Sequence, residues 1–160
     1  MVLAAPELAA RLAAGGAALF PTDTLPALAA SPLDAAQIWR LKRRPADKPL
    51  ILMAADQSQL ADVLGMAWRA EWLELAAAVW PGAVTLVLPA KGGWAEALHP
   101  AGGSLGLRIP ACAAARELLR HSGPLATTSV NRSGELAASS AAEAAAIFPQ
   151  LPLLLSLIHI

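Results

Sequence analysis

The densest cluster of charge in the sequence is basic and lies in the segment WRLKRRPADKPLIL, residues 39–52. The apolar spacing predicts a helix over residues 34–43 that ends before Pro45, and a buried strand that follows Lys48. Cations at the end of a helix favour its macrodipole, so a solvated helix terminus is one interpretation. Because rigid elements on both sides hold these cations toward one loop, a site for a polyphosphate is the other. The cations are Arg40, Lys42, Arg43, Arg44 and Lys48.

A further arginine, Arg108, lies among apolar residues in GGSLGLRIP, residues 102–110. The pattern is typical of a buried strand after a Gly-Gly-Ser turn, and a guanidinium in such a strand requires a partner. That partner is either a carboxylate of the chain or an anionic group of a ligand, and the residues alone leave both open. Ser104 in the turn offers a hydroxyl at the start of the same strand.

Short hydroxyl and amide side chains gather at the ends of two predicted strands, in FPTDTLPAL (20–28) and LATTSVNRSG (125–134). In the second segment, which ends in Gly134, such side chains suit a nucleotide, which needs many donors at close approach to the backbone. Ordinary turns and caps use the same residue types, so both interpretations stay open. The residues concerned are Thr22, Asp23, Thr24, Thr127, Thr128, Ser129 and Asn131.

Several common chemistries lack their motifs in this sequence. It contains no GxxxxGK[ST], GxGxxG or HExxH pattern. His99 and His121 stand without metal-ligand spacing, and the lone Cys112 excludes an internal disulfide. Lys and Arg total 12 and Asp and Glu total 12, so bulk charge attracts neither nucleic acid nor anionic lipid. An anion site must therefore be local.

Glycine and proline divide the chain into alternating short helices and strands, which predicts a single α/β domain. The apolar stripe of Trp68, Trp72, Leu75 and Val79 predicts one helix face packed in the core. No apolar stretch reaches about 18 residues and the N-terminus lacks a basic start, so we expect a cytoplasmic protein without a membrane partner. The predicted helices cover residues 6–14, 34–43, 56–64, 111–121 and 140–147, and the predicted strands cover 17–20, 50–53, 84–88, 105–109 and 125–128.

The C-terminal end of the sequence differs in character from the rest. FPQLPLLLSLIHI is an apolar tail, and residues 155–160 match one reading frame of a widely used transposase sequencing adapter. We therefore expect one domain over residues 1–154 and a non-native tail over residues 155–160.

Taken in order, FPTDT, LKRRPADKPL, WPGAVTLVL, SLGLRIP and PLATTSVNRSG resemble the YrdC-like threonylcarbamoyl-AMP synthase family over about residues 15–145. The resemblance implies an α/β fold of α+β type, with a single-domain twisted mixed sheet, flanking helices and a concave basic cleft. It also implies an activity that condenses L-threonine, bicarbonate or CO2, and ATP into threonylcarbamoyl-AMP and pyrophosphate. A threonylcarbamoyl transferase complex then passes the threonylcarbamoyl group to tRNA.

The resemblance also assigns roles to single residues of this chain. The triphosphate of ATP would be held, with Mg2+, by the catalytic side chains Lys42, Arg44 and Lys48. The nucleotide would also contact Ser104, Ser129 and Asn131. Threonine would contact Thr22, Thr24, Arg108 and Thr127, with Arg108 on its carboxylate.

The sequence departs from the family pattern in several places, including Met53, where some members have a histidine, and Ala137, where a serine would assist ATP. Where many members read PTDTVYGL this chain reads PTDTLPAL, so Pro26 and Ala27 reshape the threonine pocket. Members also continue with a Ser-Thr pair and an arginine, so we expect the full-length protein to be the enzyme and this 160-residue chain to be weakly active or inactive. The alternative function is a non-catalytic module of the same fold that binds double-stranded RNA, which the zero net charge disfavours.

Overall fold

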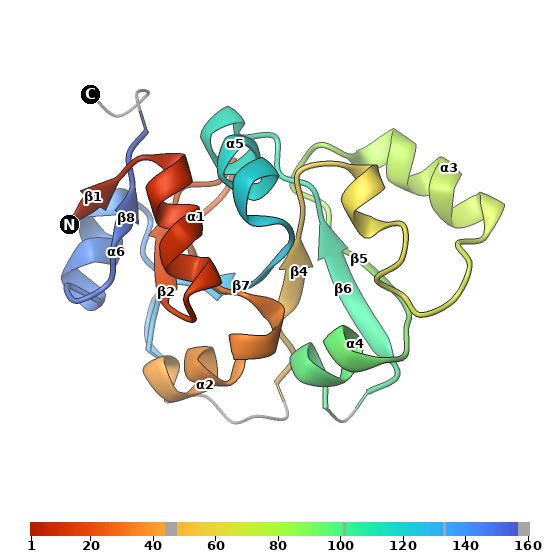
Figure 1. Cartoon of the computed structure of the whole chain (residues 1–160), viewed down its shortest axis with the longest axis horizontal. Coiled ribbons are helices and arrows are strands. Elements are labelled where there is room, and N and C mark those ends of the chain that lie inside the picture. The colour runs from red at the N-terminus through yellow and green to blue at the C-terminus, as the bar shows by residue number, and fades with distance from the viewer. Residues whose placement is uncertain (44–47, 101, 133, 157–160) are drawn as a thin grey trace.

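The computed structural model describes residues 1–43, 48–100, 102–132 and 134–156, so the predicted ligand Arg44 lies outside the described residues. The strands form one 8-stranded mixed sheet in the order β1-β8-β2-β3-β7-β4-β6-β5 (Figure 1). The pairs β1–β8, β8–β2 and β4–β6 are parallel, and the other neighbours are antiparallel. The strands are β1 (Val2–Leu3), β2 (Ala17–Phe20), β3 (Ala27–Ala30), β4 (Ile51–Met53), β5 (Leu86–Pro89), β6 (Ser104–Arg108), β7 (Leu125–Ser129) and β8 (Leu153–Leu154).

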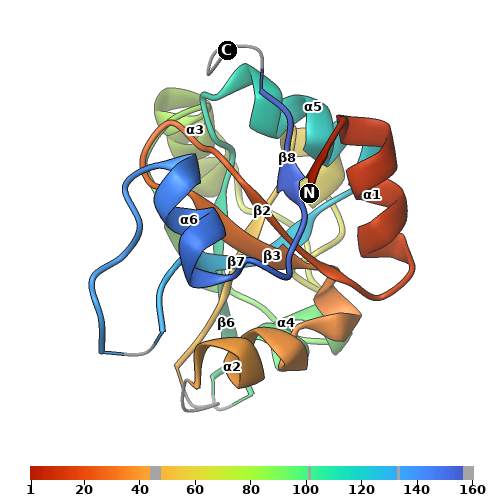
Figure 2. The same ribbon diagram turned by 90° about the vertical axis from the view of Figure 1, so that its left-hand side faces the viewer.

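Helices cover both faces of this sheet. α1 and α5 lie side by side over one face of the sheet (Figure 1). α6 lies on the opposite side of strands β8 and β2 from α1 (Figure 2). The sheet faces that they cover hold separate apolar cores. The helices are α1 (Ala5–Ala13), α2 (Ala36–Lys42), α3 (Ala70–Val79), α4 (Gly93–Leu98), α5 (Ala113–Ser122) and α6 (Ala141–Ile147), with 3-10 turns at η1 (Pro32–Asp34) and η2 (Gln57–Leu60).

Strand β2 shows how the sequence produces this layered arrangement. Successive side chains of a strand point to opposite faces, so a strand between two helical layers must be apolar throughout. Leu19 joins the core that includes Ile38 of α2 and Phe148, whereas Phe20 joins the core that includes Leu8 of α1 and Leu118 of α5. The run AALF therefore contributes to two cores at once.

The predicted α/β class with a single mixed sheet is confirmed, and each predicted strand overlaps an observed one. The helix predicted over residues 56–64 is wrong, because only the 3-10 turn η2 forms there. The helix predicted over 34–43 begins later, at Ala36, after the 3-10 turn η1. The strands β1, β3 and β8 and the short helix α4 were not predicted.

The prediction that Trp68, Trp72, Leu75 and Val79 form one helix face in the core is confirmed only in part, because Trp68, Trp72 and Val79 pack against the core but Leu75 does not. Trp68 precedes α3, where its indole Nε1 donates to the Leu60 carbonyl oxygen at 3.0 Å. Leu75 is 48% exposed, because the face of α3 that packs inward runs through Ala76 instead. Helical neighbours lie three and four residues apart, so Ala76 and Leu75 both fit the spacing from Trp72, and only packing decides between them.

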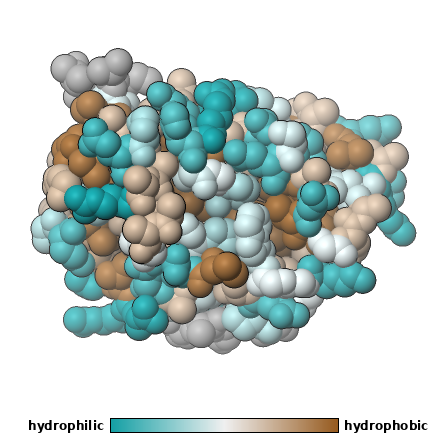
Figure 3. All heavy atoms as spheres, in the orientation of Figure 1, coloured by the Kyte–Doolittle hydropathy of each residue, from teal (hydrophilic) through white to brown (hydrophobic). Residues whose placement is uncertain are grey.

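The described helices are short. The longest helices of the described ranges, α3 and α5, have 10 residues each, and none of the described helices is a candidate for crossing a bilayer. Figure 3 shows hydrophilic and hydrophobic side chains interspersed over the face that α1 and α5 cover.

Candidate active site

The candidate site is a cavity where the loop between β2 and β3 meets β4, β6 and β7. The register places Met53 beside Arg108, and Ile51 beside Thr127, so these side chains share one face of the sheet. The cavity encloses about 220 Å³. Its lining consists of Thr22, Thr24, Leu25, Pro26, Ala27, Ile51, Met53, Arg108, Thr127, Thr128 and Ser129.

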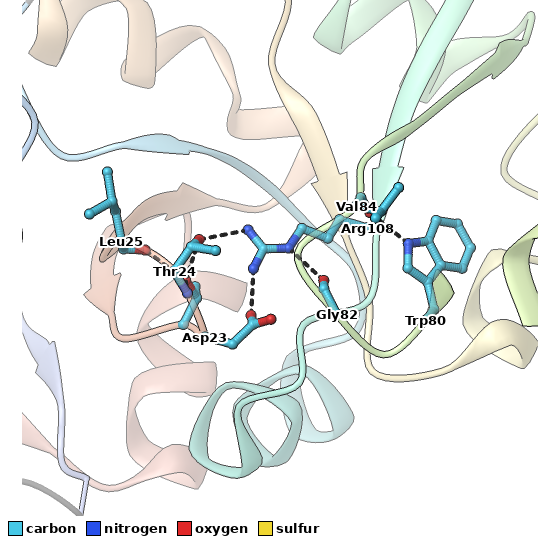
Figure 4. Close-up of polar contacts among 8 residues, drawn as sticks. Asp23, Thr24, Leu25, Trp80, Gly82, Val84 and Arg108 are labelled. Carbon is cyan, nitrogen blue, oxygen red and sulfur yellow. Dashed lines mark hydrogen bonds and ion pairs between the residues drawn. The ribbon is translucent and has the colours of Figure 1, made fainter. Parts of the chain in front are cut away.

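Arg108 is the charged residue of this lining, and it is only 7% exposed. Its Nη2 donates to Asp23 Oδ1, and its Nη1 donates to Thr24 Oγ1 at 3.0 Å (Figure 4). The sequence left open whether a carboxylate of the chain or a ligand would pair with this arginine. The structure shows an internal carboxylate, Asp23, in a nearly buried ion pair.

The position of Arg108 is also fixed from the turn before β5. Its Nε donates to the Gly82 carbonyl oxygen at 3.0 Å, and the Gly82 N–H donates to the carbonyl oxygen of Ile109 at 2.9 Å. The turn itself is braced by Trp80, whose Nε1 donates to the Val84 carbonyl oxygen at 2.8 Å (Figure 4). The guanidinium is thus held between this turn and the β2–β3 loop, and it faces the cavity in a defined orientation.

The β2–β3 loop holds its two threonines through a local network. Thr22 Oγ1 donates to the Leu25 carbonyl oxygen at 2.7 Å and accepts from the Thr24 N–H at 3.1 Å. The two hydroxyl oxygens, Thr22 Oγ1 and Thr24 Oγ1, lie 3.2 Å apart. This network is a local turn of the kind that threonine hydroxyls favour. It presents both hydroxyls to the same cavity that Arg108 lines.

Lys42, near the end of α2, contacts the strand that closes the cavity. Although charged, it is only 2% exposed, and its Nζ donates to Thr128 Oγ1 at 3.1 Å and to the Ser129 carbonyl oxygen at 2.9 Å. Arg43 directly after it adopts a left-handed conformation with φ 55° and ends the helix. The buried ammonium therefore lies against the end of β7.

Ser129 and Asn131 extend this network beyond β7. Ser129 Oγ donates to Asn131 Oδ1 at 3.2 Å, and Asn131 Nδ2 donates to the Glu135 carbonyl oxygen at 2.7 Å. Lys42 Nζ also lies 3.5 Å from Ser129 Oγ. The structure thus brings together Lys42, Ser129 and Asn131 as one polar cluster, and Ser129 connects it to the cavity.

Two of the predicted ATP ligands, Ser104 and Lys48, are brought neither to the described cavity nor to the Lys42–Ser129–Asn131 cluster, and a third lies outside the described residues. Ser104 lies at the other end of β6 from Arg108, where its Oγ is 3.2 Å from His99 Nδ1. Lys48 is exposed, and its carbonyl oxygen accepts from Trp39 Nε1 at 2.9 Å. Arg44 falls in the undescribed segment 44–47.

Asp23 is a residue that the sequence left open as either part of a binding site or a turn cap, without a partner. Its partner Arg108 is 85 residues away in the chain, so no local pattern connects them. Of the apolar lining, Pro26 and Ala27 were assigned to the pocket from the sequence, whereas Leu25 and Ile51 were not. The sequence feature that could have indicated a role for Asp23 is its position between two threonines at the end of a predicted strand.

A second cavity of the described structure is not lined by the predicted site residues. A larger cavity of about 470 Å³ lies between η2 and the start of α4, and Asp62, Lys91 and Trp94 are among its lining residues. It contains none of the predicted site residues. Among the described residues there is no group of three or more His, Cys, Asp or Glu side chains that would hold a metal ion.

The mixed sheet, with a small cavity that Arg108 lines and a buried lysine beside it, defines an α/β domain with one candidate ligand site among the described residues. The chain belongs to the Sua5/YciO/YrdC family, whose model, described as telomere recombination, matches residues 10–156.

Relatives with solved structures or curated names support this membership. The threonylcarbamoyl-AMP synthase of Bacillus subtilis (strain 168) is 40% identical over 137 residues, which is 81% of this chain and 38% of the relative. The synthase of Stutzerimonas stutzeri (strain A1501) is 32% identical over 147 residues, 90% of this chain and 79% of the relative. The crystal structure of P. abyssi Sua5 complexed with L-threonine is similar with a TM-score of 0.89 and 30% identity, covering 96% of this chain and 49% of that one. The chain thus spans less than half of the Bacillus and P. abyssi relatives.

Proposed function

We propose that the chain carries the substrate sites of an L-threonylcarbamoyladenylate synthase, which joins L-threonine, bicarbonate or CO2, and ATP into threonylcarbamoyl-AMP and pyrophosphate. The observation that carries this proposal is the convergence of Thr22, Thr24, Arg108 and Thr127 on one cavity beside the Lys42–Ser129–Asn131 cluster. The relatives that are named threonylcarbamoyl-AMP synthase support the same reaction.

The cavity suits a small amino acid that has a hydroxyl and a methyl group. Its volume of about 220 Å³ is below the range of about 300–1,000 Å³ that larger ligands require. In the proposal Arg108 binds the carboxylate of threonine, and the hydroxyls of Thr22, Thr24 and Thr127 surround its polar groups. Apolar side chains such as Leu25 and Met53 then contact the methyl group.

The polar cluster at the end of β7 suits the nucleotide. In the proposal ATP lies against Lys42, Ser129 and Asn131, and its phosphate oxygens share Lys42 Nζ with the present acceptors. Arg44, Lys48 and Ser104 complete the phosphate and nucleotide contacts that the family resemblance implies. Mg2+ enters as part of the Mg-ATP substrate, since the described lining of the cavity contains no carboxylate and the nearby Asp23 is paired with Arg108.

The chemistry needs positioning and charge neutralisation more than a nucleophilic side chain. The threonine amine combines with CO2 to form a carbamate, and a carbamate oxygen attacks the α-phosphorus of ATP while pyrophosphate leaves. Negative charge develops on the phosphates during this step, and fixed cations such as the Lys42 ammonium stabilise it. Holding both substrates in adjoining sites supplies the remaining acceleration.

In the proposal, the product passes to a threonylcarbamoyl transferase complex that modifies tRNA. ATP and tRNA are both cytoplasmic solutes, so the reaction is placed in the cytoplasm. The alternative of a double-stranded RNA-binding module has less support, because the curated relatives described above are named as synthases.

Calorimetric binding tests the proposal directly. Mg-ATP is titrated into the chain with and without L-threonine and bicarbonate, and pyrophosphate release is then followed under the same conditions. We expect saturable binding of both substrates, with binding of Mg-ATP weakened in Lys42→Ala and retained in Lys91→Ala, an exposed lysine outside the site. A folded chain that binds neither substrate would remove the proposal, and salt-dependent binding of an RNA duplex would then favour the alternative.

A further inference from the structure

Asp23 is the residue of the β2–β3 loop that the proposed function leaves without a role. Its carboxylate does not line the cavity, but it is bonded to the guanidinium that does. The side chains of Arg108 and Asp23 are only 9% and 18% exposed, so water screens this ion pair weakly. The charge of Asp23 is therefore part of the electrostatic environment of the cavity.

The guanidinium of Arg108 keeps donors for a ligand despite this pairing. An arginine side chain has five N–H groups. In the described structure Nε donates to Gly82, Nη1 to Thr24 and Nη2 to Asp23, which leaves one N–H on each terminal nitrogen. The second oxygen of Asp23, Oδ2, has no hydrogen-bond partner among the described residues. Both members of the ion pair thus have capacity to bind further groups.

A ligand carboxylate bound to Arg108 would lie close to the carboxylate of Asp23. Two carboxylates that share one cation repel each other, and in a partly buried site this repulsion weakens binding of the ligand. An α-amino acid brings its own ammonium group next to its carboxylate, so the four charges alternate in sign and sum to zero. A carboxylate without an ammonium group leaves a net negative charge in the same place.

We propose that Asp23 is a specificity-determining residue, which makes the cavity accept a zwitterionic α-amino acid in preference to a simple carboxylate anion. This inference rests on the proposed function, because it takes Arg108 as the ligand of the substrate carboxylate. It adds a selection by charge to the selection by shape that the threonines and the apolar lining provide.

A purely structural role for Asp23 gives a different result and can be separated from this one. If Asp23 only orients Arg108, its loss weakens the binding of every carboxylate ligand by the same factor. If it selects zwitterions, its loss changes the ratio of two affinities. The informative ligands are L-threonine and (R)-3-hydroxybutanoate, which is threonine without its amino group.

The experiment measures both dissociation constants by calorimetry for the wild-type chain and for three variants. Asp23→Asn removes the charge and keeps an acceptor for Arg108, Asp23→Glu retains the charge, and Asp62→Asn is an exposed matched control. We expect the preference for L-threonine over (R)-3-hydroxybutanoate to fall about tenfold to a hundredfold in Asp23→Asn. We expect it to persist in Asp23→Glu and Asp62→Asn, even if Asp23→Glu binds both ligands more weakly.

The outcomes distinguish this inference from the proposed function. If Asp23→Asn weakens the affinity for both ligands by the same factor, so that the ratio of the two dissociation constants is unchanged, the selective role is overturned and Asp23 is a positioning residue. If the folded wild-type chain binds neither L-threonine nor Mg-ATP, the proposed function itself fails. Thermal unfolding of each variant verifies that a lost affinity does not reflect a lost fold.

Discussion

Lys42 Nζ, near the C-terminus of α2, donates to the carbonyl oxygen of Ser129 at 2.9 Å, and these residues lie 87 positions apart in the chain. This contact joins the basic segment to the end of β7 across the sheet. It places a buried ammonium group where the hydroxyl and amide side chains of β7 and its following turn gather.

Replacing Lys42 by methionine keeps much of the aliphatic stem and removes the ammonium. Hydrogen bonds that involve a charged group contribute about 1.5–3 kcal/mol, so we expect the Kd for Mg-ATP to rise at least about tenfold. Isothermal titration measures this change, with Lys91→Met as a control at an exposed lysine. An unchanged Kd in a folded Lys42→Met chain would show that Lys42 has a structural role only.

Arg108→Ala should destabilise the fold strongly. It leaves Asp23 without its cation in a partly buried position, and breaking such a pair costs about 3–5 kcal/mol of unfolding free energy. Arg69→Ala is the matched control, because Arg69 and Glu71 form an ion pair of 3.5 Å whose side chains are 69% and 66% exposed. The control should cost less than about 1 kcal/mol. Urea unfolding compares the two, and similar losses would mean that the Asp23–Arg108 pair is no stronger than a surface pair.

Acid should weaken the start of α6. The backbone N–H and the hydroxyl of Ser139 donate to Glu143 Oε2 at 2.7 and 3.0 Å, and these bonds lower the pKa of Glu143 below its ordinary value of 4.5. A carboxyl whose pKa is lower in the folded state stabilises the fold above pH 4.5, and this contribution is lost as pH falls through the folded-state pKa. We expect the stability difference between wild type and Glu143→Gln to shrink as pH falls below 4.5, as measured by urea unfolding at each pH. A difference that does not vary with pH would contradict this.

Gly65 should tolerate no side chain. It has φ +69°, and a Cβ added there would lie 2.2 Å from the Lys91 carbonyl oxygen. Gly92 is a matched control, since it also has a positive φ, +103°, but nothing lies within 4 Å of its added Cβ. Gly92→Ala should cost about 1–3 kcal/mol from backbone strain alone, and Gly65→Ala should cost more. Equal changes in melting temperature would show that the loop moves away from Lys91 easily.

Much of the fold follows from local sequence signals. The run AALF is apolar at every position, which is typical of a strand buried on both faces, and β2 forms there. Ser140 and Glu143 have the spacing of a helix cap, and in the structure Ser140 Oγ accepts from the Glu143 N–H at 3.1 Å. The carboxylate of Glu143 reaches Ser139 instead of Ser140, which the pattern did not specify.

Strand β3 shows where local signals fail. Ala27–Ala30 contains three alanines, which have low strand propensity, and it follows a proline. It becomes a strand because β2 and β7 pair with it on either side. Such pairing depends on residues about a hundred positions away, such as Thr128 opposite Leu28, and a single sequence does not display it.

The residue types of the candidate site could be predicted from the sequence, but their geometry could not. The threonines, Arg108 and Lys42 are chemically distinctive, and the structure does bring them near one another. The pairing of Asp23 with Arg108 and the separation of Ser104 from the cavity depend on how β6 lies in the sheet. These relationships arise only when distant segments pack.

The position of β8 between β1 and β2 affects the order in which the strands of the sheet can pair. Val2 and Leu3 pair with Leu153 and Leu154, and the described sheet gives β1 no other neighbour. During synthesis β1 therefore gains its hydrogen-bonded partner only after Leu153 and Leu154 have been added to the chain. Contacts of such long sequence separation form slowly, so we expect β1 to stay unpaired longer than the neighbouring strands β2 and β3, and to be exposed during that time to unwanted pairing with other nascent chains.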